Sequence, residues 1–168
     1  MLSGIYEANW TLFTLYLDIL NYRSADLEDL SILLQFGEQL SLVEQNYDKT
    51  IAYDEEEARL RYTKQLFNPL ALFLIAETQE KLPVGYLYAH ISNEPPMQRG
   101  EIEVVFISEK YREAGIAQEL ISRSLAWMKD HKVKRVFSHI FAENQPSRRV
   151  FEKIGFAPHN IEYLLELN

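Results

Sequence analysis

Cysteine is absent from this 168-residue chain, and its absence removes several kinds of chemistry at once. Without thiols there is no disulfide, no zinc–thiolate site and no cysteine nucleophile. A chain built without disulfides suits a reducing compartment. We therefore expect a cytoplasmic protein.

Positive charge is also scarce, since 17 lysines and arginines stand against 25 aspartates and glutamates, with a net charge of −8 and a pI near 5.0. A nucleic-acid partner would call for a basic surface, so this balance argues against one. The cations are uneven, however, and ten of them lie between residues 110 and 153. That bias favours an anionic ligand in this half of the chain.

No hydrophobic run has the length and flanks of a membrane span. Residues 10–20 are apolar, but Asp18 interrupts them and no basic segment precedes them, so we expect neither a signal peptide nor a membrane helix. Length and a hydrophobic content of 47% suit a soluble protein with one globular domain. We assign residues 1–168 to that domain and set residues 1–10 apart as an extension.

Residues 101–128 carry the pattern around which the rest is organised. Val104–Ile107 is a β-branched and aromatic run that predicts a buried strand. After a polar turn, apolar residues recur at helical spacing: Ile116, Ala117, Leu120, Ile121, Leu125 and Met128. The start of such a helix offers unpaired N–H groups, small residues at Gly115 and Ala117 allow close approach, and Arg112 adds a fork of donors. This unit predicts a phosphate site.

Two motifs make the chain resemble the GNAT superfamily of N-acetyltransferases. Residues 112–117, Arg-Glu-Ala-Gly-Ile-Ala, fit R/Q-x-x-G-x-G/A, the loop that holds the coenzyme A pyrophosphate in that family. Asn144 and then residues 150–156, Val-Phe-Glu-Lys-Ile-Gly-Phe, resemble the family's second motif on the next helix. The motifs have the family's order, separated by a helix and a strand. The resemblance is clear over residues 71–156 and extends, more weakly, from about residue 22.

The resemblance implies that acetyl-CoA is the acetyl donor and that no metal is needed. The backbone of Val105, Phe106 and Ile107 would face pantetheine, with one N–H as an oxyanion donor. The expected pyrophosphate loop consists of Arg112, Glu113, Ala114, Gly115, Ile116 and Ala117. Asn144 would bond the pantetheine amide, and Ser147 belongs to the same set. The alternative for Asn144 is an ordinary turn residue before a proline.

Acetyl transfer from a thioester to an amine requires a base, because an amine with a pKa of about 10.4 is protonated near pH 7. Glu101 occupies the position of the glutamate base in some GNAT enzymes, and Glu103 is the second candidate. Strand alternation would put both on the same side as Val105 and Ile107. The alternative is that both are merely solvated. His139 is a third candidate, with a structural histidine as its alternative.

Two residues depart from the family pattern. Many GNAT enzymes have a tyrosine at the position of Phe151, where it protonates the leaving thiolate, but phenylalanine has no hydroxyl. Tyr163 or a water would have to serve instead, or the thiolate leaves unassisted. Glu113 is unusual in a loop that receives pyrophosphate, because like charges repel unless the side chain points to solvent.

The element order predicted along the chain is β-α-α-β-β-β-α-β-α-β, an α/β GNAT fold whose mixed sheet of six to seven strands has helices on both faces. The predicted strands cover residues 15–23, 71–76, 84–91, 101–107, 135–141 and 161–167. The predicted helices cover residues 27–43, with a break at Gly37, and residues 54–66, 116–128 and 146–154. The acidic residues 54–57 either attract a cationic amine or cap their helix.

These observations predict an acetyl-CoA-dependent N-acetyltransferase that acts on a primary amine of a small molecule, peptide or protein. The alternative is a catalytically silent acyl-CoA-binding module. A generic nucleotide binder is weaker, since neither G-x-x-x-x-G-K-[ST] nor G-x-G-x-x-G is present. The sequence does not identify the acceptor, and it leaves a homodimer open.

Overall fold

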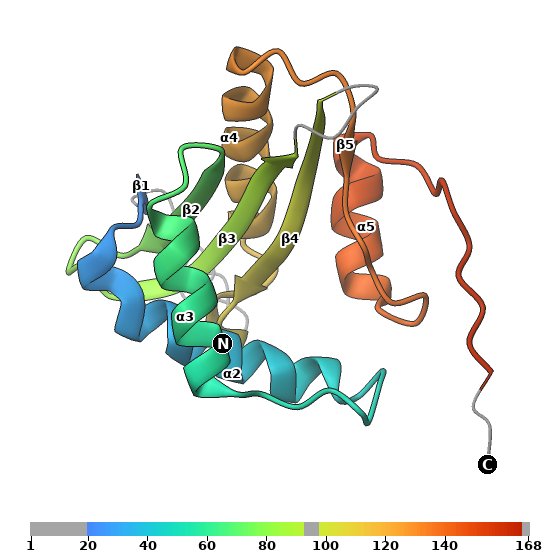
Figure 1. The fold of residues 1–168 in the computed structure, drawn as a ribbon, viewed down its shortest axis with the longest axis horizontal. Helices are drawn as coiled ribbons and strands as arrows, with labels where there is room; N and C mark the ends of the chain where they lie inside the picture. Colours follow the sequence, from blue (N-terminus) through green and yellow to red (C-terminus); the bar gives the residue numbers. More distant parts are fainter. Residues whose placement is uncertain (1–19, 93–97, 166–168) are drawn as a thin grey trace, which may run out of the picture.

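The computed structural model of the protein describes residues 20–92 and 98–165. Its strands are β1 (Asn21–Ser24), β2 (Ala71–Glu77), β3 (Pro83–Ser92), β4 (Arg99–Ile107) and β5 (Val136–Phe137). Its α-helices are α2 (Leu30–Glu44), α3 (Glu55–Leu66), α4 (Ile116–Asp130) and α5 (Gln145–Ile154). Two short 3-10 turns, η1 (Leu27–Asp29) and η2 (Glu109–Tyr111), precede α2 and follow β4 (Figure 1).

The sheet has the order β1-β2-β3-β4-β5, antiparallel except for the parallel pair β4 and β5. Helix α4 covers one face, and α2 and α3 cover the other (Figure 1). Helix α5 lies beside β4, beyond the point where β5 ends (Figure 1). The prediction of a mixed α/β sheet with helices on both faces is therefore confirmed.

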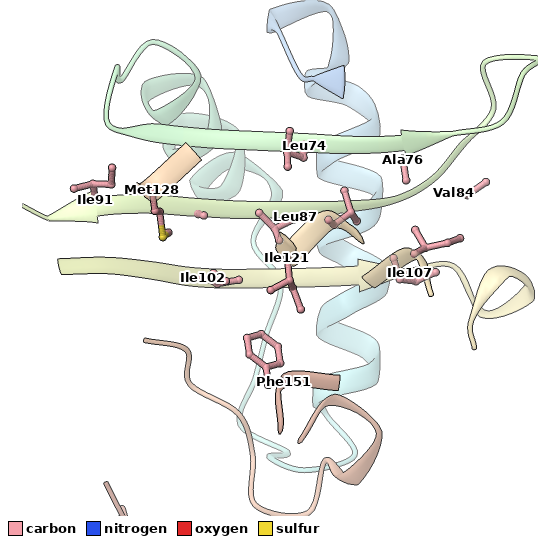
Figure 2. Packing of buried hydrophobic residues seen from close by; sticks show 13 residues of the cluster. Leu74, Ala76, Val84, Leu87, Ile91, Ile102, Ile107, Ile121, Met128 and Phe151 are labelled. Atoms are coloured by element: carbon pink, nitrogen blue, oxygen red, sulfur yellow. The ribbon is translucent and has the colours of Figure 1, made fainter. Parts of the chain in front are cut away.

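Alternation along the inner strands divides the core in two. Leu87 and Ile102 point toward α4 and pack with Ile121, on what we call the α4 face (Figure 2). Tyr86 and Phe106 point the other way and pack against α2 and α3, on the α2–α3 face. Burial on both faces explains why the central strands read as nearly continuous apolar runs.

The predicted number of strands is wrong. The described sheet has five strands, and residues 161–165, expected to belong to a closing strand, are exposed and outside the sheet. This C-terminal segment runs away from the body of the protein (Figure 1). Strand β5 also has two residues instead of the expected seven. An alternating pattern forms a strand only where an edge is available, and β5 is too short to offer one.

Two predictions for the N-terminal half need correction or limits. Most of the strand expected at residues 15–23 lies outside the described residues, and β1 begins at Asn21. Gly37 does not break its helix, because α2 continues through it. A Cβ at Gly37 would lie 2.9 Å from the Tyr62 hydroxyl, so the glycine allows α2 and α3 to approach closely. Asp54 caps α3 by accepting from Glu57 N at 3.0 Å, as the capping interpretation expected.

Arg23 ties β1 to η1 and β2. Its Nη1 and Nη2 donate to the two carboxylate oxygens of Asp29 at 2.7 and 2.8 Å, and its Nε donates to Glu77 at 2.9 Å. Hydrogen bonding to Arg23 holds the pKa of Asp29 below its ordinary value. Burial alone would raise the pKa of Glu77, but the bonds from Asn21 and Arg23 outweigh it and lower that pKa.

We expect Arg23→Met to lower the free energy of unfolding by about 1–3 kcal/mol at neutral pH, because it leaves the buried Glu77 without its charged partner. A lowered carboxyl pKa stabilises the fold above the unfolded-state value of about 4, and this contribution is lost as the pH falls below it. Urea unfolding at a series of pH values should show that the free energy of unfolding falls more steeply with decreasing pH in the wild type than in Arg23→Met. Arg59→Met, which removes the exposed pair with Glu55, is the matched control and should cost under about 0.5 kcal/mol. Equal effects of the two variants would contradict the prediction.

Candidate functional site

Strands β4 and β5 pair over only two residues and then separate. The register joins Gly100 to Val136 and Glu101 to Phe137, and Ser138 Oγ donates to a β4 carbonyl at 2.9 Å. Beyond this point no ladder pairing joins the two strands within the described ranges. Residues 103–107 of β4 therefore present an open edge on the side of α5 (Figure 1).

The peptide groups of Val105 and Ile107 face this open edge. Ser108 N donates to a β3 carbonyl at 2.9 Å, and peptide groups alternate in direction along a strand, so those of Phe106 also face β3. The Ile107 carbonyl accepts from Arg112 Nε at 3.0 Å, as expected for a group directed away from β3. An extended ligand with amide groups could pair with this edge as a strand does.

The loop before α4 ends in a helix N-terminus with no capping side chain. Gly115 is the N-cap residue, with φ +79°, and a Cβ built there would meet nothing within 4 Å. The N–H groups of Ile116, Ala117 and Gln118 have no acceptor in the described part of the chain. Together with the helix dipole, these groups form an open site for an anion. Glu113, with φ +64°, is exposed, so its charge is in solvent.

A β-bulge interrupts β4 at Glu103. The register with β3 pairs Ala89 with Ile102 and then Tyr88 with Val104, so Glu103 is the extra residue. A bulge places two consecutive residues opposite one partner and changes the phase of the alternation. In this strand the change of phase falls at the start of the open edge formed by residues 103–107.

The bulge changes which residues share a face. Glu101 and Glu103 lie on the α2–α3 face, whereas Val105 and Ile107 pack on the α4 face. The prediction that alternation puts all four on one side is therefore wrong, because the extra residue reverses the phase. The consequence is that the two carboxylates approach the open edge from the face opposite to α4.

Glu101 is held at both carboxylate oxygens. His139 Nε2 lies 3.1 Å from Oε1, and Arg99 Nη2 lies 3.7 Å from Oε2. Arg99 is itself placed by the ring of Phe137, whose centroid is 4.0 Å from the guanidinium carbon. The Glu101 side chain is only 19% exposed, and these two side chains flank its carboxylate.

Glu103 has a different environment, with 43% of its side chain exposed. His90 Nδ1 lies 3.3 Å from Glu103 Oε1, but it is shielded from solvent and makes no hydrogen bond of good geometry. Burial raises the pKa of the nearby Tyr88 to about 12, and the charge of Glu103 adds to this effect. Tyr88 therefore keeps its proton, and this face combines two carboxylates with two imidazoles and a phenol.

Helix α5 supplies the last predicted residues. Asn144 Oδ1 accepts from Ser147 N at 3.2 Å, so Asn144 caps the helix, and its Nδ2 has no acceptor among the residues that the structure describes. Phe151 is 5% exposed and packs edge to face with Phe156 at 5.0 Å. Tyr163, considered above as a substitute acid, is exposed on the C-terminal segment that leaves the body of the protein.

Two residues of this region, His90 and Arg99, were not predicted from the sequence. His90 lies opposite Glu101 in the register of β3 and β4. The alternation of side chains along β3 places His90 on the same face as Tyr86 and Tyr88, and this position could have been predicted from the sequence. Its pairing with Glu103 depends on the bulge, and no local pattern reveals that.

Two classes of site are not observed in the described ranges 20–92 and 98–165. No three histidine, aspartate or glutamate side chains gather there in a way that could hold a metal ion. None of the helices in these ranges combines the length and apolarity that a bilayer crossing requires.

Known proteins resemble this chain in sequence and in fold. A model of the acetyltransferase (GNAT) family matches residues 38–156, well over half of the chain. The uncharacterized N-acetyltransferase YycN of Bacillus subtilis is 31% identical over 77 residues, which are 46% of this chain and 49% of that protein. The chain thus spans about half the length of this curated relative.

Many solved structures share the fold. A predicted acetyltransferase with acetyl-CoA from Clostridium acetobutylicum superposes with a TM-score of 0.71 at 23% identity, covering 89% of this chain and 96% of that one. The aminoglycoside N-acetyltransferase AAC(6')-Iy, in complex with a CoA bisubstrate analogue, gives a TM-score of 0.74 at 16% identity, covering 89% and 98%. With its family match over residues 38–156 and this shared fold, the chain belongs to the acetyltransferase (GNAT) family.

Proposed function

We propose that the protein is an acetyl-CoA-dependent N-acetyltransferase that transfers the acetyl group directly to a primary amine of a small molecule, peptide or protein. The observation that carries the proposal is the open edge of β4, which leads through one short loop into the uncapped N-terminus of α4. An extended amide chain and a pyrophosphate on the same ligand would use these two features together.

The residues present fit acetyl-CoA. Val105 and Ile107 offer backbone groups to pantetheine, with Phe106 between them. The loop residues Arg112, Glu113, Ala114, Gly115, Ile116 and Ala117 offer N–H groups and one guanidinium to the pyrophosphate. We propose that Asn144 and Ser147 complete the site at the start of α5. The Nδ2 of Asn144, which has no acceptor among the described residues, would donate to the ligand. The donor, once bound, supplies the acetyl thioester.

Two tasks fall to the protein's own groups in the transfer step. Glu101 is proposed to take a proton from the amine, with Glu103 as the fallback, since both lie on the face from which the acceptor would approach. The N–H of Val105, directed at the open edge, is proposed to stabilise the negative charge that develops on the carbonyl oxygen. Phe151 offers no proton, so water is the proposed source for the leaving thiolate.

A small cationic amine is the first acceptor class to test. The carboxylates of Glu101 and Glu103 support this choice, and so does the structural likeness to an aminoglycoside N-acetyltransferase. A thiol-release assay with acetyl-CoA and a panel of mono- and polyamines should show turnover on at least one. Tight binding of CoA without turnover on any amine would favour the silent acyl-CoA-binding module instead.

The loop can be tested through its glycine. Gly115→Ala places a methyl group in the open space before the α4 N-terminus, and we expect CoA affinity to fall about tenfold or more, equivalent to about 1.4 kcal/mol. Isothermal titration calorimetry with CoA measures the change. Gly155→Ala is a matched control, because Gly155 also has a positive φ, +108°, and open space around it, but it lies at the far end of α5. Equal CoA affinities in the two variants would rule out this loop as the pyrophosphate site.

A further inference from the structure

We propose that His139 is the proton shuttle of the acetyl-transfer step and passes the amine proton from Glu101 to bulk water. The inference rests on the proposed function, in which Glu101 takes that proton. In this inference His139 acts after Glu101 has taken the proton from the amine.

The two side chains touch, and their exposures differ sharply. His139 Nε2 lies 3.1 Å from Glu101 Oε1, within reach of a direct proton transfer. The Glu101 side chain is 19% exposed, whereas that of His139 is 80% exposed. The imidazole therefore connects a largely buried carboxylate with solvent.

Among the described residues, Glu101 forms ionic contacts with Arg99 and His139, and only the imidazole of His139 can accept its proton. Arg99, at the second carboxylate oxygen, is a permanently protonated guanidinium. His90, the other imidazole on this face, faces Glu103, and its Nδ1 is shielded from solvent. A neutral imidazole, by contrast, carries a free lone pair on one ring nitrogen.

The step moves one proton and no electrons. The ammonium N–H bond breaks as an O–H bond forms on Glu101, which leaves the neutral amine as the nucleophile. The Glu101 O–H bond then breaks as an N–H bond forms at His139 Nε2. The imidazolium finally gives one proton to water, and Glu101 is again a carboxylate for the next turnover.

The experiment compares His139→Ala, His139→Gln and Glu101→Gln in initial-rate assays at low buffer concentration. We expect kcat of both His139 variants to fall by about tenfold, less than the roughly 10²-fold or larger loss typical of removing the acid–base group itself. The acceptor KM and CoA affinity should not change. Added imidazole should restore kcat of His139→Ala in proportion to its concentration, but should not restore Glu101→Gln.

Two variants separate a shuttle from a structural role. His139→Gln keeps a side-chain donor for Glu101 but cannot carry the proton, so wild-type turnover in this variant would overturn the shuttle. His159→Ala is the matched control, because His159 is another exposed histidine and contacts Arg135 at 3.2 Å. It should retain wild-type kcat.

The outcomes distinguish this inference from the proposed function. An active wild type whose His139→Ala variant is unimpaired, or is impaired without response to imidazole, overturns the shuttle alone. A wild type that binds CoA but acetylates no amine overturns the proposed function, and the shuttle falls with it. Loss of kcat in His139→Ala, its rescue by imidazole and no rescue of Glu101→Gln together support the inference.

Discussion

Replacement of Glu101 by glutamine should lower kcat by about 10²- to 10⁴-fold at neutral pH, the range typical of losing a general base. Glutamine keeps the shape of the side chain and an oxygen for His139 or Arg99, but it cannot take a proton. Glu101 lies on the face opposite to α4 and away from the anion site, so the affinity for CoA should stay nearly unchanged. Steady-state kinetics and calorimetry on the same preparation separate the two quantities.

The pH dependence of the variant gives an independent check. An amine with a pKa of about 10.4 becomes increasingly neutral as the pH rises, and a neutral amine needs no base. Raising the pH should therefore partly restore kcat of Glu101→Gln. Glu103→Gln is the comparison, and Glu80→Gln, in the exposed turn between β2 and β3, is the control. If Glu103→Gln is impaired and Glu101→Gln is not, the base lies at the bulge, and if neither is impaired, the proton leaves by another route.

The strand, turn and helix that make up the proposed anion site could be predicted from the sequence because their determinants are local. A strand, a short turn and a helix that begins at Ile116 follow from the spacing of apolar residues alone. The limits of α5 were predicted to within one residue, because proline suits the first helical turn and glycine the left-handed conformation just past the end. The helix begins at Gln145, one residue before the predicted Pro146. In each case the residues that decide the structure lie within a few positions of one another.

The side-chain directions along β4 were less predictable because long-range pairing decides them. One extra residue at Glu103 reverses the direction of every later side chain in β4. The composition of residues 99–107 does not predict this bulge. The contacts of Glu101 with Arg99 and His139 depend on where β5 stops pairing. The predicted number of strands was wrong for a similar reason, because residues 161–165 have a strand-like pattern but no strand edge to pair with.

Phe151 packs in the core but has no hydroxyl group that could act as an acid. Its replacement should have the second large effect, on stability. Its ring belongs to the core of the α4 face, near Ile102 and Ile121, and contacts Phe156 (Figure 2). It is the one buried residue of α5. The position at which the family resemblance would place a hydroxyl acid thus serves here as the anchor of α5, the helix that Asn144 caps.

We therefore expect Phe151→Ala to lower the free energy of unfolding by about 3–5 kcal/mol, the usual range for truncating a buried phenylalanine. Urea denaturation followed by circular dichroism measures the loss. Phe67→Ala is the matched control, because Phe67 is an exposed phenylalanine at the end of α3, and it should cost under about 0.5 kcal/mol. CoA affinity should fall in Phe151→Ala and not in Phe67→Ala, since Asn144 loses its fixed place when α5 loosens. If the two variants unfold at the same urea concentration, the ring does not anchor α5, and packing no longer explains the phenylalanine at this position.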